Sequence, residues 1–142
     1  MKRRKGIMFC LLLACAALAA GRVSTPEQRT IRYFDRHRTA LEEDALRTVE
    51  TGRVSGRAGI TVQYWDGAHP VVEYVVVSRG IVSASKYYGF FYSPEDEPVS
   101  FQNTGEPLTG ISAQEWEWHG QGDDYGMVRR LDTNWFYFEA SL

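Results

Sequence analysis

The sequence predicts an α+β domain in which one long N-terminal helix packs on a curved antiparallel sheet of about six to seven strands. Apolar residues recur at helical spacing between residues 26 and 51, and the period becomes strand-like from Ile60 onward. The strand-like segments are short and are separated by turn residues. Residues 87–92 (Tyr-Tyr-Gly-Phe-Phe-Tyr) are apolar on both faces, which predicts a central strand covered on both sides.

Residues 1–21 have the layout of a targeting segment. A basic start at residues 1–5 precedes an apolar run at residues 6–13 and then small residues, as in a secretory signal peptide. Residues 12–15 (Leu-Leu-Ala-Cys) resemble the lipobox of bacterial lipoproteins, and this resemblance implies that Cys15 carries diacylglycerol. Cleavage after residues 17–19 and retention as an uncleaved anchor are the alternatives, although the apolar run is shorter than the roughly 20 residues of a spanning helix.

This segment predicts the location of the rest of the chain. We expect residues 22–142 to form a single domain outside the cytoplasm, either lipid-anchored at the cell membrane or secreted. Both cysteines, Cys10 and Cys15, fall in the targeting segment, so the domain has no disulfide and depends on an apolar core.

The helix has clear start and stop signals. Thr25 and Gln28 form a capping box, Pro26 suits the first helical position, and Gly52 is a suitable left-handed terminator. These signals predict a helix over residues 26–51. Its apolar face is expected to contain Ile31, Phe34, Leu41, Ala45 and Val49.

The charges of this helix are divided between its two halves. Acidic residues follow in the second half, and arginines crowd the first half, namely Arg29, Arg32, Arg36 and Arg38. This arrangement opposes the helix dipole. One interpretation is a solvated face with Asp35 and Glu42 paired locally. The other is that a lipid anchor holds the arginines near anionic headgroups, each worth about 1 kcal/mol.

The remaining elements are strands and turns. The expected strands are residues 60–65, 71–78, 81–92, 99–102, 114–119, 126–131 and 134–140. Residues 103–110 are the longest polar loop, and Gly89 suggests a bulge or a close approach by the helix. By analogy alone, such a sheet can curl around its helix as in cystatin-like and NTF2-like folds. A β-barrel with the helix outside is the alternative.

Two segments resemble a known group of proteins. They are residues 87–102 (Tyr-Tyr-Gly-Phe-Phe-Tyr-Ser-Pro-Glu-Asp-Glu-Pro-Val-Ser-Phe-Gln) and residues 129–140 (Arg-Arg-Leu-Asp-Thr-Asn-Trp-Phe-Tyr-Phe-Glu-Ala). They are similar to small, uncharacterised, exported proteins of Gram-positive bacteria. The resemblance implies the location outside the cytoplasm and implies no activity.

Composition and motifs exclude several function classes. Without the four basic residues of the targeting segment, the chain has 12 basic and 18 acidic residues. This excess of negative charge disfavours a nucleic-acid partner. The three histidines, His37, His69 and His119, lack zinc-site spacing, and the sequence has no GxSxG nucleophile motif. The acidic loop at residues 119–124 lacks EF-hand spacing. We therefore expect no catalytic residue, no metal and no cofactor.

The aromatic residues are the strongest functional signal. They exceed what one helix needs for cover. We expect most of them to be core, and the alternative is that a few line an open groove. The candidate ligand-binding residues are Trp116, Trp118, Tyr125, Arg129 and Trp135.

These residues predict a non-catalytic binding module that meets an unknown protein or small ligand at the cell surface and touches the membrane through its N-terminal anchor only. An exposed aromatic patch would support it. One alternative is a small hydrolase using carboxylates, since Glu115 and Glu117 share one strand face; it requires acidic groups that converge in a pocket. The other is a structural or accessory subunit of a cell-surface assembly, which requires a flat apolar patch or an unpaired sheet edge.

Overall fold

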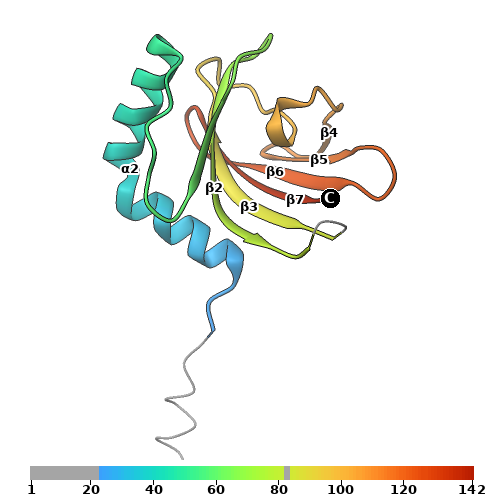
Figure 1. Cartoon of the computed structure of the whole chain (residues 1–142). Helices are drawn as coiled ribbons and strands as arrows, with labels where there is room; N and C mark the ends of the chain where they lie inside the picture. The colour runs from blue at the N-terminus through green and yellow to red at the C-terminus, as the bar shows by residue number, and fades with distance from the viewer. Residues whose placement is uncertain (1–22, 82–83) are drawn as a thin grey trace, which may run out of the picture.

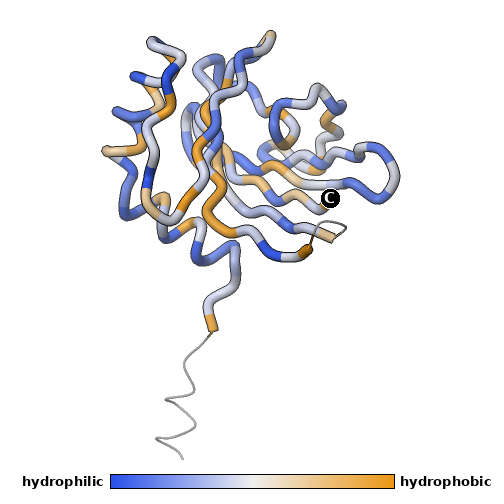
Figure 2. The backbone as a smooth tube through the Cα atoms, in the orientation of Figure 1, coloured by the Kyte–Doolittle hydropathy of each residue, from blue (hydrophilic) through white to orange (hydrophobic). Residues whose placement is uncertain are grey.

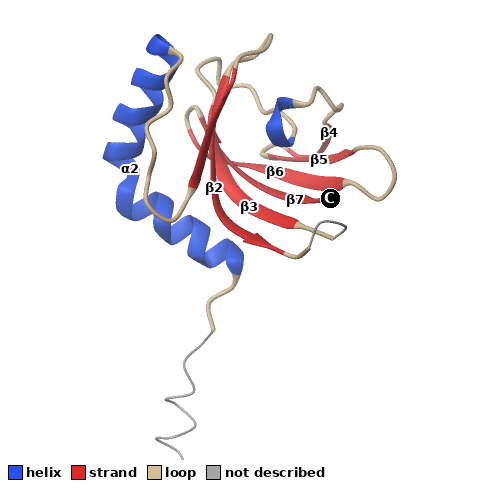
Figure 3. Ribbon diagram, in the orientation of Figure 1, coloured by secondary structure: helices blue, strands red, loops and turns tan. Residues whose placement is uncertain are grey.

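The computed structural model describes residues 23–81 and 84–142, so the predicted targeting segment, with Cys15, lies outside the described residues. One helix, α2 (Pro26–Thr51), precedes all of the strands (Figures 1 and 3). Within the described part of the chain, no helix has both the length and the apolar character to cross a bilayer. The other elements are β1 (Thr61–Trp65), β2 (Val71–Arg79), β3 (Lys86–Tyr92), the 3₁₀ helix η1 (Phe101–Asn103), β4 (Thr109–Ser112), β5 (Glu115–His119), β6 (Tyr125–Asp132) and β7 (Trp135–Ser141).

The boundaries of α2 match the prediction for the predicted reasons. The Thr25 hydroxyl accepts a hydrogen bond from the Gln28 N–H at 3.1 Å, and the Gln28 side chain accepts one from the Thr25 N–H at 3.2 Å. At the other end, Gly52 adopts φ 65° and its N–H donates to the Thr48 carbonyl at 2.8 Å. Phe34 and Leu41 are buried against the sheet.

The seven strands form one open antiparallel sheet with the order β1-β2-β3-β7-β6-β5-β4. After β3 the chain crosses to β4 at the far edge and returns strand by strand, so that β7 ends beside β3. The predicted α+β class is confirmed, and the barrel alternative is excluded because β1 and β4 remain edges. The middle strand is β7, with β3 as its neighbour.

Both faces of the sheet are covered near its middle, as the apolar segment at residues 87–92 predicts. Phe90 packs under α2 with Phe34 and Trp135. Its neighbour Phe91 points to the opposite face, where the segment between β3 and β4 brings Phe101 over a second apolar cluster. Figure 2 shows apolar residues, in orange, along the strands of the sheet.

Two local predictions differ from the structure, and the structure decides between the two alternatives at Gly89. Residues 99–102 are not a strand: Gln102 adopts φ 55°, and its N–H donates to the buried Glu73 carboxylate at 2.9 Å. The expected loop at residues 103–110 runs into β4, which was not predicted. At Gly89, the bulge alternative is confirmed, because the pairing of β2 with β3 shifts register between Val75 and Val77, opposite this glycine. A Cβ atom there would lie 2.2 Å from the Tyr74 carbonyl oxygen and 2.5 Å from the Phe138 ring, so neighbouring strands rather than α2 require the glycine.

Candidate functional site

The helix leaves part of its own sheet face uncovered. It packs on β2 and β3, whereas β6, β5 and β4 extend beyond it (Figure 1). The strand registers place Tyr88, Glu139, Met127 and Glu117 in one row across β3, β7, β6 and β5. Because side chains alternate along a strand, these four lie on the same face as Phe90, which is the face that α2 covers elsewhere.

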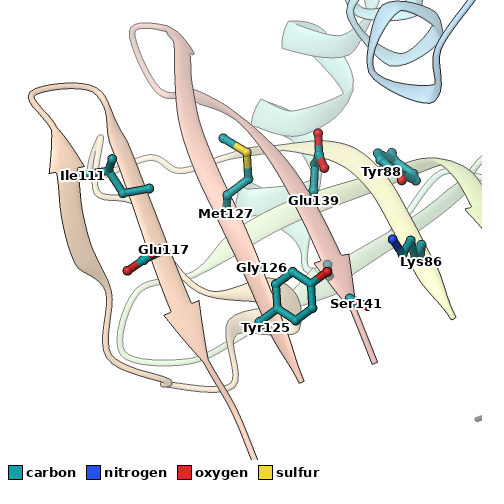
Figure 4. A pocket seen from close by; sticks show the side chains of 10 residues that line it. Lys86, Tyr88, Ile111, Glu117, Tyr125, Gly126, Met127, Glu139 and Ser141 are labelled. Carbon is teal, nitrogen blue, oxygen red and sulfur yellow. The ribbon is translucent and has the colours of Figure 1, made fainter. Parts of the chain in front are cut away.

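This uncovered row forms a hollow, which we call the sheet groove (Figure 4). It has a volume of about 270 Å³. Two of its apolar side chains are prominent: Tyr125 is 49% exposed and Ile111, on the edge strand β4, is 57% exposed. Its lining residues are Lys86, Tyr88, Ile111, Glu117, Tyr125, Gly126, Met127, Glu139, Ala140 and Ser141.

The floor of the sheet groove depends on Gly126. A Cβ atom at this position would lie 2.4 Å from the Glu139 carbonyl and 2.5 Å from the Trp118 indole nitrogen. The buried Trp118 ring packs under the strand here, so a glycine is the residue that fits between ring and groove. The glycine therefore accommodates the Trp118 ring on the opposite face, and its backbone lines the sheet groove.

Two carboxylates and one ammonium group give the sheet groove its charge. Glu117 and Glu139 flank Met127 in the row, and the two Cα atoms are about 10 Å apart because two strand spacings separate them. The Tyr137 hydroxyl donates to Glu139 at 2.8 Å, and burial together with this carboxylate raises the pKa of Tyr137. Lys86 lies at the far side, so the lining has a net negative charge.

The structure separates the five predicted ligand-binding residues. Trp135 is fully buried under α2, where its indole N–H donates to Glu42 at 3.1 Å. Trp118, 3% exposed, and the half-buried Trp116 lie on the opposite face, in the cluster with Phe101.

Arg129 is on the open face but is engaged elsewhere. It donates to Glu27 of α2 at 2.6 Å and lies over the Tyr137 ring at 5.1 Å. Among the five, Tyr125 lines the sheet groove. The aromatic side chains of the sheet groove are the exposed Tyr125 and the half-buried Tyr88, and its lining contains no tryptophan.

Sequence reasoning missed Met127 and Glu139, and it counted Tyr88 among the surplus aromatic residues without selecting it. The sequence pattern shows which face of its own strand each residue occupies. The residues meet in one groove only because β7 lies between β3 and β6, and the pattern does not give this strand order. Over residues 23–81 and 84–142, no three His, Cys, Asp or Glu side chains are grouped closely enough to hold a metal ion.

No family model matches the sequence, and no curated protein or solved structure is significantly similar to it. The resemblance to exported Gram-positive proteins therefore stays a prediction.

Proposed function

We propose that this chain is a non-catalytic binding domain outside the cytoplasm, tethered to the membrane by its N-terminal segment, and that the sheet groove is its ligand site. The observation that carries the proposal is the groove itself. Exposed apolar side chains such as Tyr125 and Ile111 gather where α2 leaves the sheet bare, and charged groups surround them.

The lining indicates the chemistry of the ligand. Met127, Ile111 and Ala140 offer apolar contact, and the tyrosine rings can face a cation. Two carboxylates against one lysine favour a positively charged group. The volume of about 270 Å³ is at the low end for ligand sites, so the groove fits one or two side chains of a peptide or a small amine. The proposed ligand is a short, amphipathic, cationic molecule.

A titration monitored by NMR tests this proposal. The probe is an amphipathic hexapeptide with two lysines, and the matched control is the same peptide with two glutamates. The lysine peptide should shift the amide signals of Tyr88, Tyr125 and Met127, and the glutamate peptide should not. No shift in the groove with either peptide would overturn the groove as ligand site, and equal shifts would overturn the charge argument.

Two exposed apolar residues provide a matched pair of variants. Ile111→Ala should weaken binding of the lysine peptide about tenfold, since it removes most of a side chain from the groove. Leu46→Ala truncates a side chain on α2 that is similarly exposed, at 51%, and lies outside the groove, so it should leave affinity unchanged. Equal losses in both variants would indicate non-specific apolar binding.

A small hydrolase is the second candidate, and one observation favours it. Glu117 and Glu139 line the same hollow, although Glu115, the partner expected from the sequence, is not among the lining residues. Hydrolysis of chromogenic glycosides or peptides that disappears in both Glu117→Gln and Glu139→Gln would replace the binding module with an enzyme. Absence of turnover, together with lysine-peptide binding, would support the first proposal.

A further inference from the structure

Three arginines share one outward face of α2. Arg29, Arg32 and Arg36 follow the i, i+3, i+7 spacing of a single helical stripe, and all three are exposed. They border a hollow of about 390 Å³ between α2 and residues 58–60. The stacked rings of Tyr33 and His37, 4.2 Å apart, form part of its wall. We call these five residues the arginine face.

The arginine face has an unbalanced positive charge. Within the described ranges, Arg29, Arg32 and Arg36 form no ion pair, while four other arginines, Arg38, Arg47, Arg129 and Arg130, each meet a carboxylate. Arg38, expected to belong with the first three, instead contacts Asp132 at 2.7 Å and Glu42 at 3.8 Å.

The acidic residues beside the arginine face do not neutralise it. The carboxylate of Glu27 is occupied by Arg129. Asp35, between Arg32 and Arg36 in the sequence, is exposed and takes part in no ion pair among the described residues. In a domain with more acidic than basic residues, these three arginines on one stripe form a local basic patch that attracts anions.

The arginine face lies where the described chain begins. Ser24 lines the same hollow, and Val23, the first described residue, is 92% exposed. Figure 1 shows this start, in blue, leading directly into α2. Because the proposed tether is attached within a few residues of the arginines, it holds them at high effective concentration near whatever surface it enters.

We propose that the arginine face docks on the surface of a bilayer that contains anionic phospholipids, and thereby fixes the orientation of the domain. The inference rests on the tether of the proposed function and adds a second membrane contact to it. Charge complementarity selects the occupant: three guanidinium groups suit phosphate headgroups, and Tyr33 and Val23 suit the interfacial region. Each arginine contributes about fivefold, so loss of all three should weaken docking about 100-fold.

The experiment uses the full chain in lipid nanodiscs, made of phosphatidylcholine alone or with phosphatidylglycerol added, each with a paramagnetic headgroup lipid. In the anionic discs, the amide signals of residues 29–36 should broaden, and high salt should reverse the effect. Signals of residues 115–119 on β5 should be unaffected. The triple variant Arg29→Gln, Arg32→Gln, Arg36→Gln should lose the broadening while keeping a dispersed spectrum that shows it is folded.

A matched pair of single variants separates location from total charge. Arg36→Gln should reduce the broadening about fivefold. Arg53→Gln removes the same charge from an exposed residue just after α2, about 25 Å along the helix axis, and should have no effect.

Each proposal can fail separately. If the chain enters neither disc, the result refutes the membrane tether of the proposed function. It also refutes the bilayer as the partner of the arginine face. If the chain enters both discs and residues 29–36 respond equally in each, the arginine face is overturned while the tether stands. Inorganic phosphate that reproduces the shifts of residues 29–36 without any lipid would indicate a free-anion site and overturn the bilayer.

Discussion

Glu73 provides the sharpest test of the packing described above. Its side chain is 2% exposed in β2, between Gln63 of β1 and Phe91 of β3. One carboxylate oxygen accepts from the Gln102 N–H at 2.9 Å, and within the described residues the other has no hydrogen-bond partner. Such a carboxyl group is far more stable when it is protonated.

The pKa of Glu73 reflects this environment. Burial raises the pKa from 4.5 to about 7, against smaller lowering effects of the Gln102 N–H and of the Trp65 indole, which lies nearby without a well-formed hydrogen bond. The folded state therefore keeps a proton that the unfolded chain has already lost. The contribution of Glu73 to the free energy of unfolding is therefore greatest below pH 4.5. It falls by about 3 kcal/mol in all as the pH rises towards about 7.

The variant Glu73→Gln isolates this effect. A glutamine is similar in size, its amide oxygen can accept from the Gln102 N–H, and it carries no charge at any pH. Near pH 4, both proteins should have similar free energies of unfolding. Near pH 8, the variant should be more stable by about 3 kcal/mol, because the wild-type protein must keep a carboxylate buried.

Urea unfolding at a series of pH values between 4 and 8 measures the difference. Taking the difference between the two proteins cancels the other titrating groups. Glu97→Gln, at an exposed position between β3 and η1, controls for the loss of one carboxylate. A stability difference that stays constant over this pH range would refute the buried position of Glu73. A wild-type protein that gains stability relative to the variant as the pH rises would refute the sign.

The remaining predictions use the same unfolding measurement. Tyr74→Phe should cost about 2 kcal/mol, because it removes the hydroxyl that donates to the buried Asp44 at 2.9 Å; a double-mutant cycle with Asp44→Asn that shows no coupling would contradict this. Gly89→Ala should cost about 3 kcal/mol or prevent folding, since its methyl group would overlap the Phe138 ring, and a neutral effect would disprove that packing. Thr25→Ala should cost about 1 kcal/mol, whereas Thr25→Ser should restore the cap.

Local signals predicted the helix and most of the strands. The capping box at Thr25 and the terminator at Gly52 act through adjacent backbone groups, so the sequence near them is sufficient to place both ends of α2. Strand prediction failed where a distant contact decides the backbone. Residues 99–102 alternate like a strand, but Glu73 holds the Gln102 N–H and η1 forms instead.

β4 shows the opposite failure. Its four residues include a single large apolar side chain, Ile111, so no alternating pattern predicts a strand there. The strand exists because β5 offers it a pairing edge, with Gly110 opposite Trp116. Pairing of this kind is a property of the assembled sheet and is absent from the segment itself.

The candidate site was less predictable than the fold for a related reason. Alternation correctly placed Trp116 and Trp118 on one face of a strand, with Glu117 on the other. It could not tell which face stays open, because that depends on where α2 ends over the sheet. Nor could it bring Tyr88 next to Met127, since those residues meet only through the insertion of β7 between their strands.

The Glu27–Arg129 contact links the two proposed surfaces. Glu27 is in the first turn of α2, two residues before Arg29, and Arg129 follows Met127 at the next position on the same face of β6. A domain that docks through α2 would therefore hold the sheet groove at a fixed angle to the bilayer, because this contact and the packing of Phe34 on Phe90 join helix and sheet. Tethering and ligand binding then depend on one rigid unit, and neither surface can reorient without breaking contacts of the core.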